Sequence, residues 1–331
     1  MMTLSRLQTL FTAKSFSQLA GKFTAQPLNQ LQLLLAAGHF VLSAELTPPR
    51  HYKIHSFIAN AEKIAPYVDV IQVNDNAMAQ ARLSTLVAAQ LLLRSNLEPV
   101  IQLTLRHRNR IALQSDLLGF AALGIRNIIV LGGYPCSIGS DPEAKDATDL
   151  SVNDTIAAIH RLTSRGQLFN GQIIAPPPGF YIGAIATPSS DIAASVAKLA
   201  ARIDQGAKYI QLQAVYDLEL LQQWMAAVRA SGLHQRAHFI AALYPFGGLK
   251  SLQQLNQVPG LNIPDAVINR LAQSRDNRSE SLKINLELVQ EIRAIEGIQG
   301  LHLRAIQPRD WIPHIADLLR VVPQRQINMP R

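Results

Sequence analysis

The chain of 331 residues has one cysteine, Cys136, few aromatic residues (6%) and few charged ones (16%). A single thiol forms neither an internal disulfide nor a zinc cluster, which favours a reducing compartment such as the cytoplasm. The sparse aromatic residues offer no stacking platform for bases, and the basic residues are scattered, so nucleic-acid binding is not expected. No apolar run approaches the roughly 20 residues that span a bilayer, so no membrane contact is expected. The net charge of +8 suits a phosphate-bearing ligand.

Acidic residues are absent before Glu45. The first 25 residues combine Arg6, Lys14 and Lys22 with several serines and threonines, a composition also found in transit peptides. The interpretation preferred here is a polar arm that leads into a helix over residues 28–37, because arginine is sparse. Whether the arm is a targeting segment stays open.

Eight short apolar runs alternate with stretches of helical spacing, of which Ile192, Val196, Leu199 and Ile203 are the clearest. Continuous apolar runs are typical of parallel strands that helices cover. The predicted strands are residues 41–46, 69–73, 99–103, 127–131, 181–186, 208–213, 238–243 and 300–305. Eight β-then-α units predict a (β/α)8 TIM barrel, a single α/β domain over 39–322, with an arm and helix over 1–38 and a tail over 323–331. An open doubly wound sheet is the alternative, but it usually has a glycine-rich turn after its first strand.

Long loops follow two of the predicted strands. Residues 132–149 follow strand four, and residues 247–280 follow strand seven and are expected to include an extra short helix. Loops of this length are usually functional or mobile, and barrel enzymes carry their chemistry on the loops after the strands. The site is therefore expected at the carboxyl ends of the strands.

Glu45 lies at the end of the first strand, directly before Leu46 and three residues before the first of two prolines. A carboxyl group at a barrel mouth can be desolvated enough to serve as a general acid; a solvated glutamate paired with an arginine is an equally good interpretation. Gln213 ends strand six and Asn74 follows strand two. Such amides can bind the edge of a heterocycle, although polar residues also commonly punctuate strand ends.

The segment 106–110 carries Arg106, His107 and Asn109 and opens a helix after strand three. Guanidinium groups and helix-start amides suit a phosphate, and a solvated basic face is the alternative. Gly132 and Gly133 would let a ligand approach the backbone, as a tight turn would also require. His51 and His55 have metal-ligand spacing but no third ligand in motif form, so surface histidines are expected.

In their order and spacing, these segments resemble the methylenetetrahydrofolate reductase family from about Phe40 to Leu319. The segments that carry the resemblance are AELTPPR (44–50), QLT with RHRNR (102–110), LGIRN (123–127), DPEAK with DL (141–150), and GA (206–207) leading to Gln213 and Asp217. The resemblance implies FAD at the barrel mouth, a hydride taken from NADH or NADPH, and reduction of 5,10-methylenetetrahydrofolate to 5-methyltetrahydrofolate. It does not choose between the two nicotinamides. A homo-oligomer is also expected.

The resemblance also implies roles for particular residues. Glu45 matches the acid that protonates the folate, a role that needs a carboxyl group held protonated. Gln213 and Leu249 match substrate contacts. The flavin-binding positions would be Asn74, Gln102, Arg106, Asn109, Gly132, Gly133, Tyr134, Asp149, Lys198 and Arg202.

The chain departs from the family pattern near the flavin. Tyr134 follows Gly132-Gly133 where the family usually has an acidic residue, and His107 stands where an aspartate is frequent. Leu212 precedes Gln213 in place of a threonine, and Leu249 replaces an aromatic residue unless Phe246 substitutes for it. Loss of a carboxylate near the flavin should raise its reduction potential. Two alternatives therefore stay open: a folate- or flavin-binding regulatory or partner module without redox turnover, and a reductase that acts on another one-carbon carrier.

Overall fold

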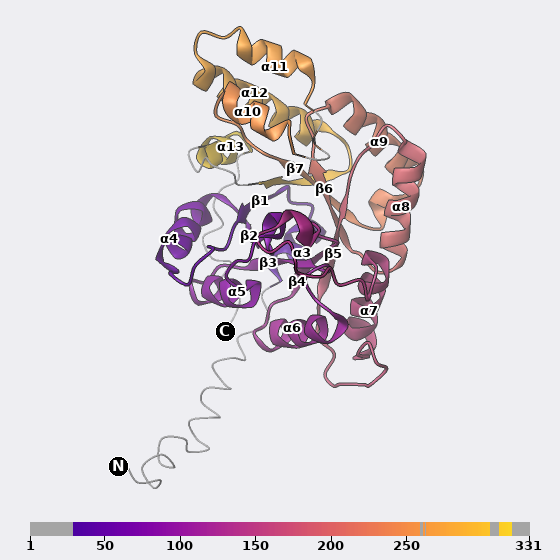
Figure 1. Ribbon diagram of the computed structural model, residues 1–331. Helices are drawn as coiled ribbons and strands as arrows, with labels where there is room; N and C mark the ends of the chain where they lie inside the picture. Colours follow the sequence, from indigo (N-terminus) through magenta and orange to yellow (C-terminus); the bar gives the residue numbers. More distant parts are fainter. Residues whose placement is uncertain (1–28, 259–260, 262, 305–310, 320–331) are drawn as a thin grey trace, which may run out of the picture.

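The structure is a computed structural model that describes residues 29–258, 261, 263–304 and 311–319, and the statements below concern this part of the chain. Eight parallel strands pair in chain order, and β1 pairs with β8 to close a barrel (Figure 1). The strands are β1 (Val41–Leu46), β2 (Val70–Val73), β3 (Pro99–Thr104), β4 (Asn127–Leu131), β5 (Tyr181–Ala186), β6 (Tyr209–Ala214), β7 (His238–Leu243) and β8 (Ile298–Leu303). The predicted (β/α)8 barrel is therefore confirmed.

Helices surround the barrel, and their apolar residues form a large core with the outer faces of the strands (Figure 1). In α8, for example, the buried residues are Val196, Leu199 and Ile203, three of the four that the helical spacing predicted, and the fourth, Ile192, is partly buried. The α-helices are α3 (Gln30–Ala36), α4 (His55–Ile64), α5 (Thr85–Arg94), α6 (Arg110–Ala122), α7 (Val152–Arg165), α8 (Ile192–Asp204), α9 (Leu218–Ala230), α10 (Leu249–Leu255), α11 (Asp265–Ala272), α12 (Asn277–Ala294) and α13 (Trp311–Leu319). The stretch after β7 thus holds two additional helices, α10 and α11, where one was expected. Of the predicted arm and helix over 1–38, residues 1–28 lie outside the described residues, as does the predicted tail over 323–331, and α3 corresponds to the helix expected over 28–37.

The two faces of each strand have different environments. Leu42, Ala44 and Leu46 of β1 point outward and pack in the large core between barrel and helices, whereas Val41 belongs to a second core inside the barrel. The amino-terminal end of the barrel is closed by α3, whose apolar residues pack on this inner core. The inner core consists of Leu31, Leu34, Leu35, Val41, Val70, Val100, Ile129, Tyr181, Tyr209 and Ile240.

Above this apolar floor, the barrel interior is polar. Gln72 of β2 donates its amide to Gln211 of β6 across 2.8 Å, and it accepts the amide of Gln102 across 2.7 Å. On another side, Ser43 and His302 form a hydrogen bond of 2.8 Å between β1 and β8. The interiors of such barrels are usually filled by branched apolar residues. A buried polar layer is stable only when its polar groups are hydrogen-bonded, as these side chains are.

No helix within the described residues has both the length and the hydropathy required to cross a membrane.

Candidate functional site

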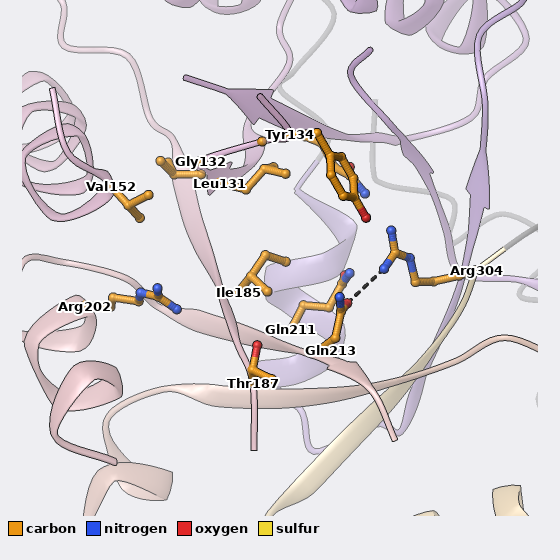
Figure 2. Close-up of a pocket in the computed structure, with 13 residues that line it drawn as sticks. Leu131, Gly132, Tyr134, Val152, Ile185, Thr187, Arg202, Gln211, Gln213 and Arg304 are labelled. Carbon is orange, nitrogen blue, oxygen red and sulfur yellow. Dashed lines mark hydrogen bonds between the residues drawn. The ribbon is translucent and has the colours of Figure 1, made fainter. Parts of the chain in front are cut away.

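A cavity of about 320 Å³ opens at the carboxyl ends of β3 to β6, with Arg304 on its β8 side (Figure 2). This volume is at the lower end of the range for ligand pockets, about 300–1,000 Å³. The cavity is lined by Gln102, Val130, Leu131, Gly132, Gly133, Tyr134, Val152, Ile185, Thr187, Arg202, Gln211, Gln213 and Arg304. Two of these side chains are guanidinium groups and none is a carboxylate, so the wall favours ligands with acceptor atoms or negative charge.

Glu45 lies next to the cavity and is connected to it by two lining residues. Its side chain is buried, and its Oε2 accepts a hydrogen bond of 3.1 Å from the amide of Gln102. The same oxygen lies 3.7 Å from Nε of Arg304. Arg304 in turn donates through Nη1 to Oε1 of Gln213 across 2.9 Å, a contact drawn in Figure 2. Residues from β1, β3, β6 and the end of β8 therefore form one connected polar group.

Arg304 is held from several sides. It directly follows β8, its backbone N–H donates to the carbonyl of Leu243, and its guanidinium lies 4.6 Å from the ring centre of Tyr244. Burial by itself would lower the pKa of Arg304, but the charge of Glu45 and nearby tyrosine hydroxyl groups outweigh it, and the pKa is raised. Arg304 is therefore a fixed cation at the cavity wall.

Arg202 provides the second positive charge. It belongs to α8 and projects into the cavity from the side opposite Arg304 (Figure 2). Burial lowers the pKa of Arg202, and no side chain of the described residues pairs with it. A partly buried guanidinium without a partner is well suited to a phosphate or carboxylate of a ligand.

Gly132, Gly133 and Tyr134 form the β4 side of the cavity. A Cβ at Gly132 would meet only a methyl group of Val152 at 4.0 Å, so the absent side chain leaves room in the cavity. The hydroxyl end of Tyr134 points toward Arg304 (Figure 2). His107 donates Nε2–H to the carbonyl oxygen of Tyr134 across 3.2 Å, so two of the positions that depart from the family pattern touch each other.

The segment predicted to bind phosphate makes mainly internal contacts. Asn109 is the N-cap of α6 and accepts the N–H groups of Ile111 and Ala112, while Asp149 accepts the N–H of Arg110. Arg106 forms an ion pair with Asp146. The helix-start amides are thus already hydrogen-bonded. Arg106, Asn109 and Asp149 lie outside the cavity lining. Arg106 acts here as an ion-pair partner, Asn109 as a helix cap and Asp149 as an amide acceptor.

Three further predicted positions also lie away from the cavity lining. Asn74 is buried and donates its amide to the hydroxyl of Thr47 across 2.7 Å. Lys198 is exposed on α8, and Leu249 packs against the large core at the start of α10. Phe246, the possible substitute for Leu249, is fully buried beside Tyr216.

The predicted residues that do line the cavity are Gln102, Gly132, Gly133, Tyr134, Arg202 and Gln213. Sequence reasoning missed Arg304, Gln211 and Thr187. A signal existed for Arg304, because a charged residue that ends an apolar strand of a barrel points to the mouth. Gln211 lies two residues before Gln213 and therefore on the same face of β6.

The exposed His51 and His55 do not assemble a metal site. Among the described residues, no group of three or more histidine, cysteine, aspartate or glutamate side chains is arranged to hold a metal ion.

The cavity fits part of an FAD molecule. It has room for a flat ring, amides of Gln102 and Gln211 at its inner end, an open backbone at Gly132, and the unpaired cation Arg202 for a phosphate. The fit is weaker toward α6, where the start of the helix is capped by Asn109. The described residues therefore suit the flavin ring and one phosphate.

The fold and the site define a (β/α)8 barrel with a polar, positively charged ligand cavity at the carboxyl ends of its strands. Residues 30–320 match the sequence model of the family described as methylenetetrahydrofolate reductase. The chain belongs to this family, whose members are usually oxidoreductases.

Two similar proteins, one a sequence relative and one a solved structure, both have low sequence identity to the chain. Methylenetetrahydrofolate reductase 1 of Schizosaccharomyces pombe is 25% identical over 183 residues, which are 54% of this chain but only 28% of the yeast protein. The chain therefore corresponds to little more than a quarter of that relative. A solved structure of an uncharacterized protein from Clostridium thermocellum, which binds two copies of 5-methyl-5,6,7,8-tetrahydrofolic acid, superposes with a TM-score of 0.61. The identity is 16%, over 88% of this chain and 99% of the other, and this likeness concerns the fold.

Proposed function

We propose that the chain is an FAD-dependent reductase that converts 5,10-methylenetetrahydrofolate to 5-methyltetrahydrofolate with NADH or NADPH. One observation carries the proposal. Glu45 contacts Gln102 and Arg304, and Arg304 contacts Gln213, at the edge of a cavity that could hold a flat ring. Family membership and the folate bound by the Clostridium thermocellum protein give independent support for a folate ligand.

Different residues of the chain would bind the flavin and deliver the proton. Gln102 and Gln211 would hold the polar edge of the flavin, Arg202 would bind a phosphate, and Gly132 would leave the space that the ring needs. The bound flavin would supply hydride transfer. Glu45, which lies beside the cation Arg304, would have to take up a proton before it could act as the acid. That proton would be carried on Oε1, because Oε2 is engaged by Gln102 and Arg304 whereas Oε1 has no partner among the described residues.

The variant Glu45→Gln tests this assignment. It retains the shape of the side chain and removes the proton, so turnover of 5,10-methylenetetrahydrofolate should fall by about 100-fold or more. Reduction of the flavin by the nicotinamide, followed as bleaching in anaerobic stopped flow, should keep its rate. The matched control is Glu62→Gln, because Glu62 is an exposed glutamate on α4. Wild-type folate turnover in the Glu45 variant would refute the role of Glu45.

A second candidate is a folate-binding module without redox turnover. Two observations favour it: no carboxylate lines the cavity, and the start of α6 is occupied by the side chain of Asn109. The visible spectrum of the purified protein separates the candidates. A flavin band that NADH or NADPH bleaches supports the reductase. A colourless protein that takes up no FAD but binds 5-methyltetrahydrofolate in calorimetry supports the module, and a protein that binds no folate contradicts both.

A further inference from the structure

Arg304 and Gln213 form a contact whose hydrogen-bond direction is unambiguous. A guanidinium group has only donors, so the atom of Gln213 that faces Nη1 of Arg304 at 2.9 Å must be the carbonyl oxygen Oε1. The amide of Gln213 is thereby fixed in one of its two orientations. Its NH2 group has no hydrogen-bond partner among the described residues, and Gln213 lines the cavity.

Arg304 itself retains an unused donor group. Its Nη1 binds Gln213, whereas its Nη2 forms no hydrogen bond within the described residues, and Arg304 lines the cavity. Its Nε is buried, lies 3.7 Å from Oε2 of Glu45 and is not available to a ligand. The guanidinium lies against the ring of Tyr244, which helps to hold it in place. This wall of the cavity thus presents N–H groups from two neighbouring side chains.

We infer that Arg304 determines the specificity of this site by fixing Gln213 as a hydrogen-bond donor, so that the wall formed by these two residues selects a ligand edge made of acceptor atoms. The inference rests on the proposed function, which supplies the ligand class, a reduced pteridine. In a folate, the carbonyl oxygen at position 4 of the pteridine is such an acceptor. The 4-amino-4-deoxy analogue carries an NH2 group at the same position, and two donors that face each other cannot form a hydrogen bond.

The test therefore compares the affinities of the protein for two ligands. Dissociation constants for 5-methyltetrahydrofolate and for its 4-amino-4-deoxy counterpart are measured by calorimetry on the full chain. The wild type should bind the 4-oxo compound about 10- to 100-fold more tightly, the effect expected for hydrogen bonds that involve a charged group. Equal affinities of the wild type for both compounds would overturn the inference while leaving folate binding, and with it the proposed function, intact. A failure to bind either compound would instead contradict the proposed function.

Two variants separate specificity from stability. Arg304→Met removes the donors and frees the amide of Gln213 to rotate, so the ratio of the two affinities should fall to about 3 or less. Because this variant leaves the buried Glu45 without its cation, it is also measured with Glu45→Gln, which removes the unpaired charge. An unchanged ratio in the double variant would contradict the role of Arg304.

The variant Gln213→Glu provides an independent test that keeps Arg304 paired. A carboxylate at position 213 offers Arg304 a stronger partner and presents only acceptors to the cavity. The preference should therefore invert in favour of the 4-amino compound. If the Arg304–Gln213 contact had only a structural role, the variant would bind both compounds more weakly, and the ratio of the two affinities would stay that of the wild type. That result would overturn the inference.

Discussion

Two adjacent glycines in the cavity wall differ in what a side chain would meet. Gly133 has a φ of +84°, and a Cβ there would lie 2.1 Å from a methyl group of Thr104. Thr104 cannot easily give way, because its N–H and hydroxyl groups both bind Asp75. Gly132, by contrast, has open space beside it. One glycine is thus required by the backbone, and we propose that the other is required by the ligand.

The variants Gly133→Ala and Gly132→Ala separate these two requirements. Gly133→Ala combines left-handed backbone strain with overpacking and should lower the free energy of unfolding by about 2–4 kcal/mol. Gly132→Ala should change it by less than about 1 kcal/mol and should mainly weaken ligand binding. Urea unfolding and calorimetry measure the two effects. Equal stability of the two variants would show that the clash at Gly133 is relieved by movement of the loop.

At the scale of residues, the sequence predicts the site in part. Gln102, Gln213 and Arg202 were placed at the mouth by their strand or family positions, and they line the cavity. Asn109 and Asp149 were predicted as ligand contacts, but both bind amides at the start of α6. A short polar side chain can serve a backbone amide or a ligand equally well, so only the folded geometry decides between them. The roles of the lining residues in binding remain predictions.

At the scale of elements, the short helix α3 depends on a side chain from another part of the chain. It has no side-chain cap of its own, and the N–H of Gln30 donates to Oε2 of Glu98 across 2.7 Å, with Leu31 as a second backbone donor. Asn127 also donates to Glu98. Burial raises the pKa of Glu98 to about 7, although these hydrogen bonds favour the carboxylate. The closure of the barrel floor is therefore linked to pH.

The direction of this linkage follows from the raised pKa. Between pH 4.5 and 7 the folded protein holds a proton on Glu98 that the unfolded chain has lost, so this residue makes the protein more stable in acid. The contribution is complete below pH 4.5 and is lost as the pH rises through 7. His302, whose pKa burial lowers well below 6.5, acts in the opposite direction, so total stability does not report on Glu98 alone.

The comparison with Glu98→Gln isolates the effect. The free energy of unfolding of the wild type minus that of the variant should decrease by about 2–3 kcal/mol from pH 5 to pH 8. Urea unfolding at several pH values gives this difference, and His302 cancels because both proteins contain it. A difference that stays constant with pH would mean that Glu98 is ionised throughout this range.

The boundaries of the elements were easier to predict than their caps. Continuous apolar runs located all eight strands to within two residues, since strands buried on both faces leave a strong pattern. The helix after residue 28 was also expected, but its closure of the barrel floor and its dependence on Glu98 were not. That contact joins residues 68 positions apart, and no local pattern records it.

At the scale of the whole molecule, the polar layer inside the barrel connects opposite walls. Gln72 on β2 and Gln211 on β6 are 139 positions apart and exchange hydrogen bonds across the interior. Gln102 on β3 joins them and continues to Glu45. The site at the mouth thus rests on a hydrogen-bonded layer, and this layer rests on the apolar floor.

Replacement of Gln72 by leucine should show how far this layer stabilises the barrel. The variant leaves amide groups of Gln102 and Gln211 without these partners and should cost about 2–4 kcal/mol. Because an unpaired polar group costs more than a missing pair, the double variant Gln72→Leu/Gln211→Leu should lose less than the sum of the two single changes. Urea unfolding of the four proteins completes the cycle. Simple additivity would show that the two side chains are not coupled.

The closure between β1 and β8 has a consequence during synthesis of the chain. Ser43 and His302, which meet across this seam, are 259 positions apart, and Glu45 and Arg304 meet just above them. While the ribosome is still making the preceding strands, the first strand has one neighbour only and the acid has no cation beside it. The cavity wall is complete only once the eighth strand has left the exit tunnel. A chain that terminates before Arg304 lacks this part of the wall, so we expect it to be unable to form the proposed ligand site.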